Sequence, residues 1–112
     1  MKRYFSILFP LILLNSCNPF RGKDIPPCLP SKIQEFDQTY NCDEAKVDCF
    51  LFQGQYVYAF DPGVCAYADM QTEILDDHCE TLGFLGGIMG NTEINGVSFF
   101  ENAQFIETVW TK

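Results

Sequence analysis

Residues 46–60 read KVDCFLFQGQYVYAF, and this stretch decides the fold. On each side of Gln53-Gly54, apolar or aromatic residues recur at alternate positions, which is the period of a β-strand. A glycine-containing pair between two such runs is typical of a β-hairpin turn. Both faces of this hairpin are apolar, so we expect it inside a sheet with a helix packed on one side.

Downstream of this hairpin, the sequence predicts further antiparallel strands. Residues 72–84 have the pattern of a second, shorter hairpin. A glycine-rich loop is expected over residues 83–90, and Asn95-Gly96 is the strongest two-residue turn signal in the chain. The alternation over residues 105–110 predicts a closing strand.

Upstream of the hairpin, the sequence predicts one amphipathic helix that ends near Tyr40. Ser31 followed by Gln34 has the form of a capping box. The apolar stripe of the helix consists of Leu29, Ile33, Phe36 and Tyr40. These elements together predict an α+β domain, in which one N-terminal helix packs on a small antiparallel sheet of hairpins and disulfides support the fold.

Residues 1–16 have the organisation of a signal peptide. A basic start precedes an apolar stretch, residues 4–14, that is too short to cross a bilayer, because a spanning helix needs about 20 residues. Leu14-Asn15-Ser16-Cys17 resembles a bacterial lipobox, in which cleavage precedes the cysteine and the cysteine carries the lipid. We therefore expect a lipidated Cys17; the alternative is an ordinary signal peptide that is cut elsewhere and leaves Cys17 unmodified.

The rest of the chain is expected to form a tether and one domain. Residues 17–30 contain four prolines and a glycine, which suits an extended tether. Residues 31–112 then form a single small α+β domain. A domain of this size buries only about 60% of its unfolded surface and is marginally stable without covalent support.

Six cysteines occur in the 112 residues, and short exported domains use such cysteines as disulfides. If Cys17 carries lipid, five remain, so one thiol must stay unpaired within the chain. The sequence alone permits every pairing. Our preferred arrangement is Cys42–Cys49 and Cys65–Cys79, with Cys28 as the free thiol; zinc is the competing use, but no C-x-x-C pair is present.

The charge distribution excludes several classes of partner. Fifteen acidic against seven basic residues give a net charge of −8, and no Lys or Arg lies between Lys46 and Lys112. Nucleic acid and phosphate ligands need cations, so neither is expected as a partner. The acidic stretch between Asp37 and Glu80 is a solvated face or, functionally, a patch that steers a basic partner.

Candidate catalytic and metal-binding residues are few. His78 is the only histidine, and its place in a predicted turn favours a solvated side chain. Asn91, Glu93 and Asn95 supply oxygens at alternate positions before a glycine, as in an EF-hand loop, which makes them a weak calcium candidate. A hairpin turn explains the same residues more simply. We expect no cofactor.

Several short motifs follow one another in a distinctive order: the lipobox, Pro-Cys before the helix, Gly54-Gln55-Tyr56-Val57-Tyr58, Cys65 with Asp69, Asp76-x-x-Cys79, Gly86-Gly87-x-x-Gly90-Asn91 and a closing Val109-Trp110. In this order they resemble a family of short bacterial lipoprotein domains of unknown function, over about residues 28–111. The resemblance implies a location in the envelope and the extent of the domain, and it implies no activity.

These observations predict a lipid-anchored module of the bacterial cell envelope that faces the periplasm or the exterior. The abundant aromatic residues mainly fill the core, and some are available as a contact surface for a protein or a glycan. We expect a binding or inhibitory module rather than an enzyme. The alternatives are a small carboxylate-dependent, hydrolase-like enzyme and a calcium-stabilised structural domain.

Overall fold

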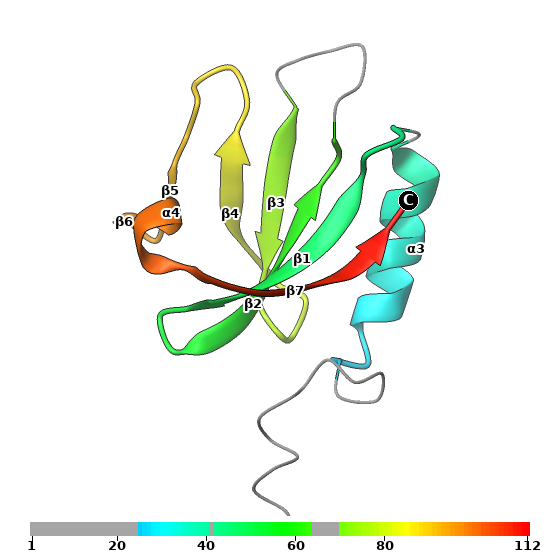
Figure 1. The fold of residues 1–112 in the computed structure, drawn as a ribbon, viewed down its shortest axis with the longest axis horizontal. Coiled ribbons are helices and arrows are strands. Elements are labelled where there is room, and N and C mark those ends of the chain that lie inside the picture. Colours follow the sequence, from blue (N-terminus) through cyan, green and yellow to red (C-terminus); the bar gives the residue numbers. More distant parts are fainter. Residues whose placement is uncertain (1–24, 41, 64–69) are drawn as a thin grey trace, which may run out of the picture.

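A computed structural model describes residues 25–40, 42–63 and 70–112. Most of this part of the chain is antiparallel sheet, with a short helix ahead of it (Figure 1). The elements are α3 (Leu29–Thr39), β1 (Lys46–Phe52), β2 (Gln55–Asp61), β3 (Gln71–Leu75), β4 (Thr81–Gly86), β5 (Glu93–Ile94), β6 (Val97–Ser98), α4 (Phe99–Asn102) and β7 (Gln104–Thr111).

The first hairpin lies in the middle of the sheet, as its sequence predicts. Five strands are ordered β4-β3-β2-β1-β7 and all neighbours run antiparallel, while β5 and β6 form a separate small hairpin. Gln53 and Gly54 join β1 to β2 with φ angles of 53° and 79°, the left-handed backbone that tight hairpin turns require. The second hairpin and the closing strand are also confirmed, as β3–β4 and β7.

One face of the sheet is covered by α3, and we call it the helix face. Phe36 reaches from the helix to Phe60 of β2 and Trp110 of β7, with ring centroids 5.2 and 6.0 Å away and the rings close to perpendicular. Leu29 is fully buried in the same cluster, and Ile33 and Tyr40 pack at its edge. The predicted apolar stripe of the helix is therefore confirmed.

The opposite face is covered by the β5–β6 hairpin and the single turn α4, and we call it the hairpin face (Figure 1). Side chains alternate between the two faces along each strand, so Val57 packs here whereas its neighbour Tyr58 lies on the helix face. Phe99 of α4 and Ile94 of β5 are almost completely buried against the sheet. The sequence did not predict α4.

The predicted start of the helix is wrong. The helix begins at Leu29 with Pro30 in its first turn, and no side chain caps it. Ser31 lies inside the helix, where its hydroxyl donates to the carbonyl oxygen of Cys28 at 3.2 Å. Because Leu29 is buried and Cys28 is disulfide-bonded, residues 28–30 belong to the packed domain and not to a tether that runs to residue 30.

The preferred cysteine pairing is also wrong. Cys28 is not free but forms a disulfide with Cys79, which joins the start of α3 to the turn between β3 and β4. Cys49 is a free, buried thiol in β1 and does not pair with Cys42. Cys42 is disulfide-bonded to a cysteine outside the described residues, where Cys17 and Cys65 lie. Residues separated by 51 positions cannot be paired from local sequence, because their approach depends on the whole fold.

The glycine-rich loop is shorter than predicted. Residues 83–86 extend β4, where Gly83 and Gly86 pair with Ile74 and Gln71 of β3. Only the segment after residue 86 is a turn, and it returns to the sheet through a bridge between Gly86 and Asn91. A Cβ atom on Gly83 would lie 2.9 Å from the side chain of Ile94, so close packing with the hairpin explains this glycine.

Candidate functional site

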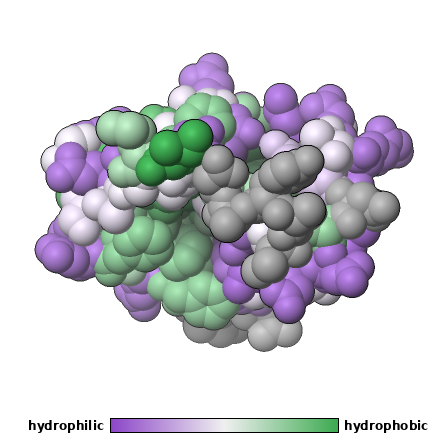
Figure 2. Space-filling model, turned by 90° about the horizontal axis from the view of Figure 1, so that it is seen from above, coloured by the Kyte–Doolittle hydropathy of each residue, from purple (hydrophilic) through white to green (hydrophobic). Residues whose placement is uncertain are grey.

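An open hollow of about 320 Å³ lies on the hairpin face, and we call it the hairpin-face hollow. The β5–β6 hairpin and α4 cover only part of this face, so the end of the sheet where β1 starts and β2 ends stays accessible. Lys46, Asp48, Phe50, Ala59, Asp61, Met70, Thr72, Leu85, Gly86, Phe99 and Phe100 line the hollow. Viewed from this end, the molecule shows a hydrophobic band framed by hydrophilic side chains (Figure 2).

The hollow exists because small residues occupy its floor. Ala59 of β2 pairs directly with Asp48 of β1 on one side and with Ile74 of β3 on the other. Thr72 and Gly86 add little volume toward the end of the sheet. Larger apolar side chains in their places would fill this space, as Phe52 and Val57 do farther along the same face.

A carboxylate is buried at the base of the hollow. Asp48 is only 7% exposed, and its Oδ1 atom accepts a hydrogen bond from the Thr108 hydroxyl at 2.6 Å. Its Oδ2 atom lies 3.4 Å from the Lys46 ammonium group, which is two residues earlier on the same face of β1. A buried carboxylate is stable only when it is paired and hydrogen-bonded in this way.

A second carboxylate lies at the rim. Asp61 pairs with Lys46 across β1 and β2, so the two side chains stand on the same face of the sheet. Its Oδ1 atom accepts a hydrogen bond from the Gly63 N–H group at 2.9 Å and holds the turn that leaves β2. The described residues that line the hollow therefore include two carboxylates and one ammonium group, which together carry a formal charge of −1.

Three phenylalanines form the wall of the hollow opposite the charged residues. The rings of Phe50 and Phe99 lie 5.1 Å apart at 73°, and those of Phe99 and Phe100 lie 5.8 Å apart at 88°. Phe99 is buried, whereas Phe100 is 68% exposed, so the wall continues from the core to the surface. A concave site with apolar walls and a few fixed polar groups is the usual form of a ligand pocket.

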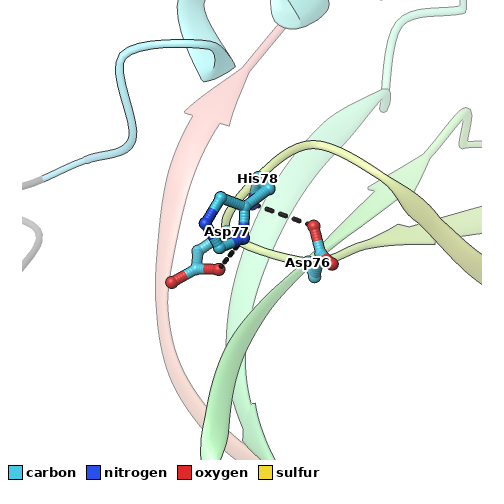
Figure 3. Close-up of side chains that lie close together, drawn as sticks. All are labelled: Asp76, Asp77 and His78. Carbon is cyan, nitrogen blue, oxygen red and sulfur yellow. Dashed lines mark hydrogen bonds and ion pairs between the residues drawn. The ribbon is translucent and has the colours of Figure 1, made fainter.

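A cluster of possible metal ligands lies at the other end of the sheet, in the turn between β3 and β4. Asp76, Asp77 and His78 each offer one ligand atom within 4.8 Å of the others (Figure 3). Asp76 Oδ1 already accepts backbone N–H groups of His78 and Glu80 at 2.8 and 2.9 Å and thereby shapes the turn. The His78 side chain is 81% exposed and lies 3.1 Å from Asp77, so a solvated turn accounts for the cluster.

A larger hollow of about 500 Å³ opens beside this turn and the Cys28–Cys79 disulfide. Tyr58 and Tyr56 stand on one side of it, and the Tyr58 hydroxyl is hydrogen-bonded to the Cys49 thiol. Burial raises the pKa of Cys49 to about 12, and it raises the pKa of Tyr58 above its usual range. Both groups are therefore protonated at neutral pH, and neither is an activated nucleophile.

The weak calcium candidate is better explained by the β5–β6 hairpin. The Asn91 amide nitrogen donates to the carbonyl oxygens of Phe84 and Glu93 at 2.6 and 2.9 Å. Asn95 and Gly96 form the turn with φ angles of 55° and 75°. These side chains hold a hairpin together, and strands flank the turn instead of the helices of an EF-hand.

Sequence reasoning missed the charged residues of the hairpin-face hollow. The available signal was the polar side chains at Lys46, Asp48 and Asp61 in a hairpin that is otherwise apolar. The period of two places Lys46 and Asp48 on one face. The predicted turn at Gln53-Gly54 also places Asp61 opposite Lys46, because the length of the turn sets the register of a hairpin. Nothing in the sequence indicates that Thr108 joins them, because that depends on how β7 pairs with β1. Cys17, the predicted lipid site, and Cys65 lie outside the described residues.

The fold and the site together define a small, disulfide-bonded domain of antiparallel sheet, with an open hollow of mixed polar and apolar lining on the hairpin face. The chain belongs to the family described as domain of unknown function DUF6970, whose model matches residues 34–112. That range begins within α3 and includes every strand of the sheet. No curated protein and no solved structure shows significant similarity to the chain. In the described segments, no helix has both the length and the apolar character to span a membrane.

Proposed function

We propose that this protein is a lipid-anchored binding module of the bacterial cell envelope. In this proposal Cys17 carries the anchor, the domain faces the periplasm or the exterior, and the partner is an envelope protein or glycan. The Cys28–Cys79 disulfide supports an oxidising compartment, because such bonds are rare where thiols are kept reduced. The basic and apolar N-terminus ahead of Cys17 supports export.

The hairpin-face hollow is the observation that carries the binding role. An exposed aromatic ring, Phe100, continues into a concavity that ends on the buried carboxylate of Asp48. Burying a charge costs folding free energy, and here Thr108 and Lys46 must offset that cost. A polar site maintained at such a cost beside open aromatic surface favours ligand recognition.

The placement of the hollow fits an anchored receptor. The disulfide holds the start of α3 at the same end of the sheet as the β3–β4 turn (Figure 1). The hollow is lined by Lys46 at the start of β1 and Asp61 at the end of β2, which lie near the opposite end of the sheet. Cys17 and Cys28 are eleven positions apart, a length that reaches at most about 40 Å when fully extended. In the proposed arrangement, the segment to the anchor joins the domain at the end of the sheet away from the hollow and does not have to pass over it.

A binding role is favoured over a carboxylate-dependent enzyme. Both oxygens of Asp48 are engaged by Thr108 and Lys46, and Asp61 already bonds its own turn. The histidine lies in the turn at the far end of the sheet, and the Cys49 thiol is buried on the other face. No acid–base pair therefore points into the hollow from the described residues.

The anchor is tested by labelling cells with radioactive palmitate. We expect the wild-type band to be labelled and the Cys17→Ser variant to be unlabelled, because only the cysteine can form the thioether. An unlabelled wild-type band would contradict the anchor and leave the binding role to be tested separately.

The binding role is tested by photocrosslinking in the native envelope. A benzophenone amino acid at position 100 should capture a partner, and the same group in place of the exposed Phe84 on the helix face should not. Thr72→Phe should abolish capture because the added ring fills the hollow, whereas Thr111→Phe at an exposed strand end should not. Capture that is unaffected by Thr72→Phe would overturn the proposal.

A further inference from the structure

We infer that the hairpin-face hollow selects a ligand group with a positively charged nitrogen on an apolar stem, that is, an alkylammonium or a guanidinium group. The inference rests on the proposed binding function and adds the chemical class of the ligand. It is carried by three properties of the hollow, namely its charge, its aromatic wall and its size.

The charge of the hollow favours a cation. Among the described residues, Lys46 is the only basic one that lines it, and its ammonium group is paired with Asp48. Asp61 uses its Oδ1 atom to accept the Gly63 N–H group, while its Oδ2 atom has no hydrogen-bond partner among the described residues. An incoming cation can therefore pair with Asp61, whereas an anion would meet two carboxylates and one ammonium group that is already neutralised.

The aromatic wall favours the same ligand. Phe50, Phe99 and Phe100 line the same hollow as the two carboxylates. The face of an aromatic ring attracts a cation, and the attraction grows as the site excludes water. Ala59 and Leu85 complete an apolar floor on which the methylene groups of a stem can pack.

The size of the hollow and the net charge of the chain narrow the range of possible ligands further. A volume of about 320 Å³ is near the lower end for ligand pockets, so the hollow suits a single small molecule or one long side chain. The net charge of −8 on the whole chain attracts cations from a distance and repels anions. A small amine and a lysine or arginine side chain of an envelope protein share this chemistry.

The test compares charged probes with neutral probes of the same shape. Choline and 3,3-dimethylbutan-1-ol form one pair, and acetyl-lysine methylamide and acetyl-norleucine methylamide form the other. Each is titrated into the full-length chain in non-ionic detergent, and binding is followed by the NMR shifts of the Ala59 and Gly86 amides. We expect the charged member to bind about tenfold more tightly in at least one pair. Preference for choline indicates a free amine, and preference for the lysine probe indicates a protein side chain.

Matched variants connect the preference to named residues. Asp61→Asn keeps the Oδ1 acceptor for Gly63 but removes the charge, so it should lower the affinity for the charged probe about fivefold and leave the neutral probe unchanged. Phe100→Ala should also lower the affinity for the charged probe, because it removes an aromatic ring from the wall of the hollow. Asp77→Asn and Phe84→Ala, which lie outside the hollow, serve as controls and should change neither affinity.

Equal binding of the charged and neutral probes, no saturable binding by either pair, or an affinity that is unchanged in Asp61→Asn would each overturn the cation preference. The binding function itself fails if position 100 captures no partner or if Thr72→Phe leaves the capture unaltered. Loss of capture in Thr72→Phe without any charge preference would thus preserve the proposed function and reject only the ligand class.

Discussion

The two faces of the same five-stranded sheet are built differently. On the helix face, α3 adds an aromatic cluster in which Phe36 contacts Phe60 and Trp110, and a disulfide holds the start of the helix. On the hairpin face, the short β5–β6 hairpin and α4 cover only part of the sheet, and the rest is a hollow with two carboxylates. The helix face is therefore closed by packing and a covalent link, whereas part of the hairpin face stays open, and it is there that we propose a ligand binds.

The largest expected change in stability is the one caused by loss of the Cys28–Cys79 disulfide, which tests the difference between the two faces. The bond closes a loop with a sequence separation of 51, for which chain entropy gives about 4 kcal/mol of the free energy of unfolding. Replacing both cysteines by alanine should lower the urea midpoint accordingly. An unchanged midpoint would show that the helix face does not depend on its covalent link.

A non-reducing peptide map of the same samples identifies the partner of Cys42. We expect Cys65, because lipid on Cys17 would remove the alternative. A further reason is the approach of the chain at Gly63, where a Cβ atom would lie 2.6 Å from the backbone of Glu44. A peptide that joins Cys42 to Cys17 would contradict both this pairing and the lipid anchor.

The next prediction compares the loss of stability when one phenylalanine is removed from each face. Phe36→Ala should lower the free energy of unfolding by about 3 kcal/mol, because it opens a cavity among buried rings. Phe100→Ala should change it by no more than about 0.5 kcal/mol, because that side chain is already 68% exposed. Chemical denaturation measures both. Equal losses would remove the distinction between a stabilising face and a binding face.

A smaller loss of unfolding free energy is expected from a substitution at the base of the hollow. Thr108→Val removes the hydroxyl that donates to the buried carboxylate of Asp48, so it should cost about 1 to 2 kcal/mol. The same substitution at Thr111, which is exposed as Thr108 is but does not donate to Asp48, is the control and should be nearly neutral. If both variants unfold at the wild-type midpoint, the Asp48 carboxylate does not need its hydroxyl partner.

The smallest effect tests whether water is excluded from the helix face. The pKa of Cys49 is raised to about 12 in the folded chain, against 9.0 for an ordinary cysteine. The unfolded chain therefore loses this proton first, so the stabilisation is complete below pH 9 and decreases as the pH rises. Between pH 9 and pH 10, wild type should lose about 1 kcal/mol more than Cys49→Ala. Rapid maleimide labelling of the native thiol at pH 8 would contradict the exclusion of water.

Local sequence determined most of the strands. The alternation on each side of Gln53-Gly54 predicted β1 and β2, and Asn95-Gly96 predicted the β5–β6 turn. These signals are reliable because the side-chain period and the left-handed turn backbone depend on adjacent residues. The apolar stripe predicted the packing of α3 for the same reason, whereas the capping box failed because Pro30 and the disulfide position the start of the helix.

Only the tertiary structure decided which residues meet across long distances in the chain. Asp48 finds Thr108 sixty positions away, and Cys28 finds Cys79. Neither contact has a local signal, because strand order and register set the approach of distant segments. The hollow also depends on the tertiary structure. It forms where small residues line the sheet and the elements that cover the hairpin face do not reach.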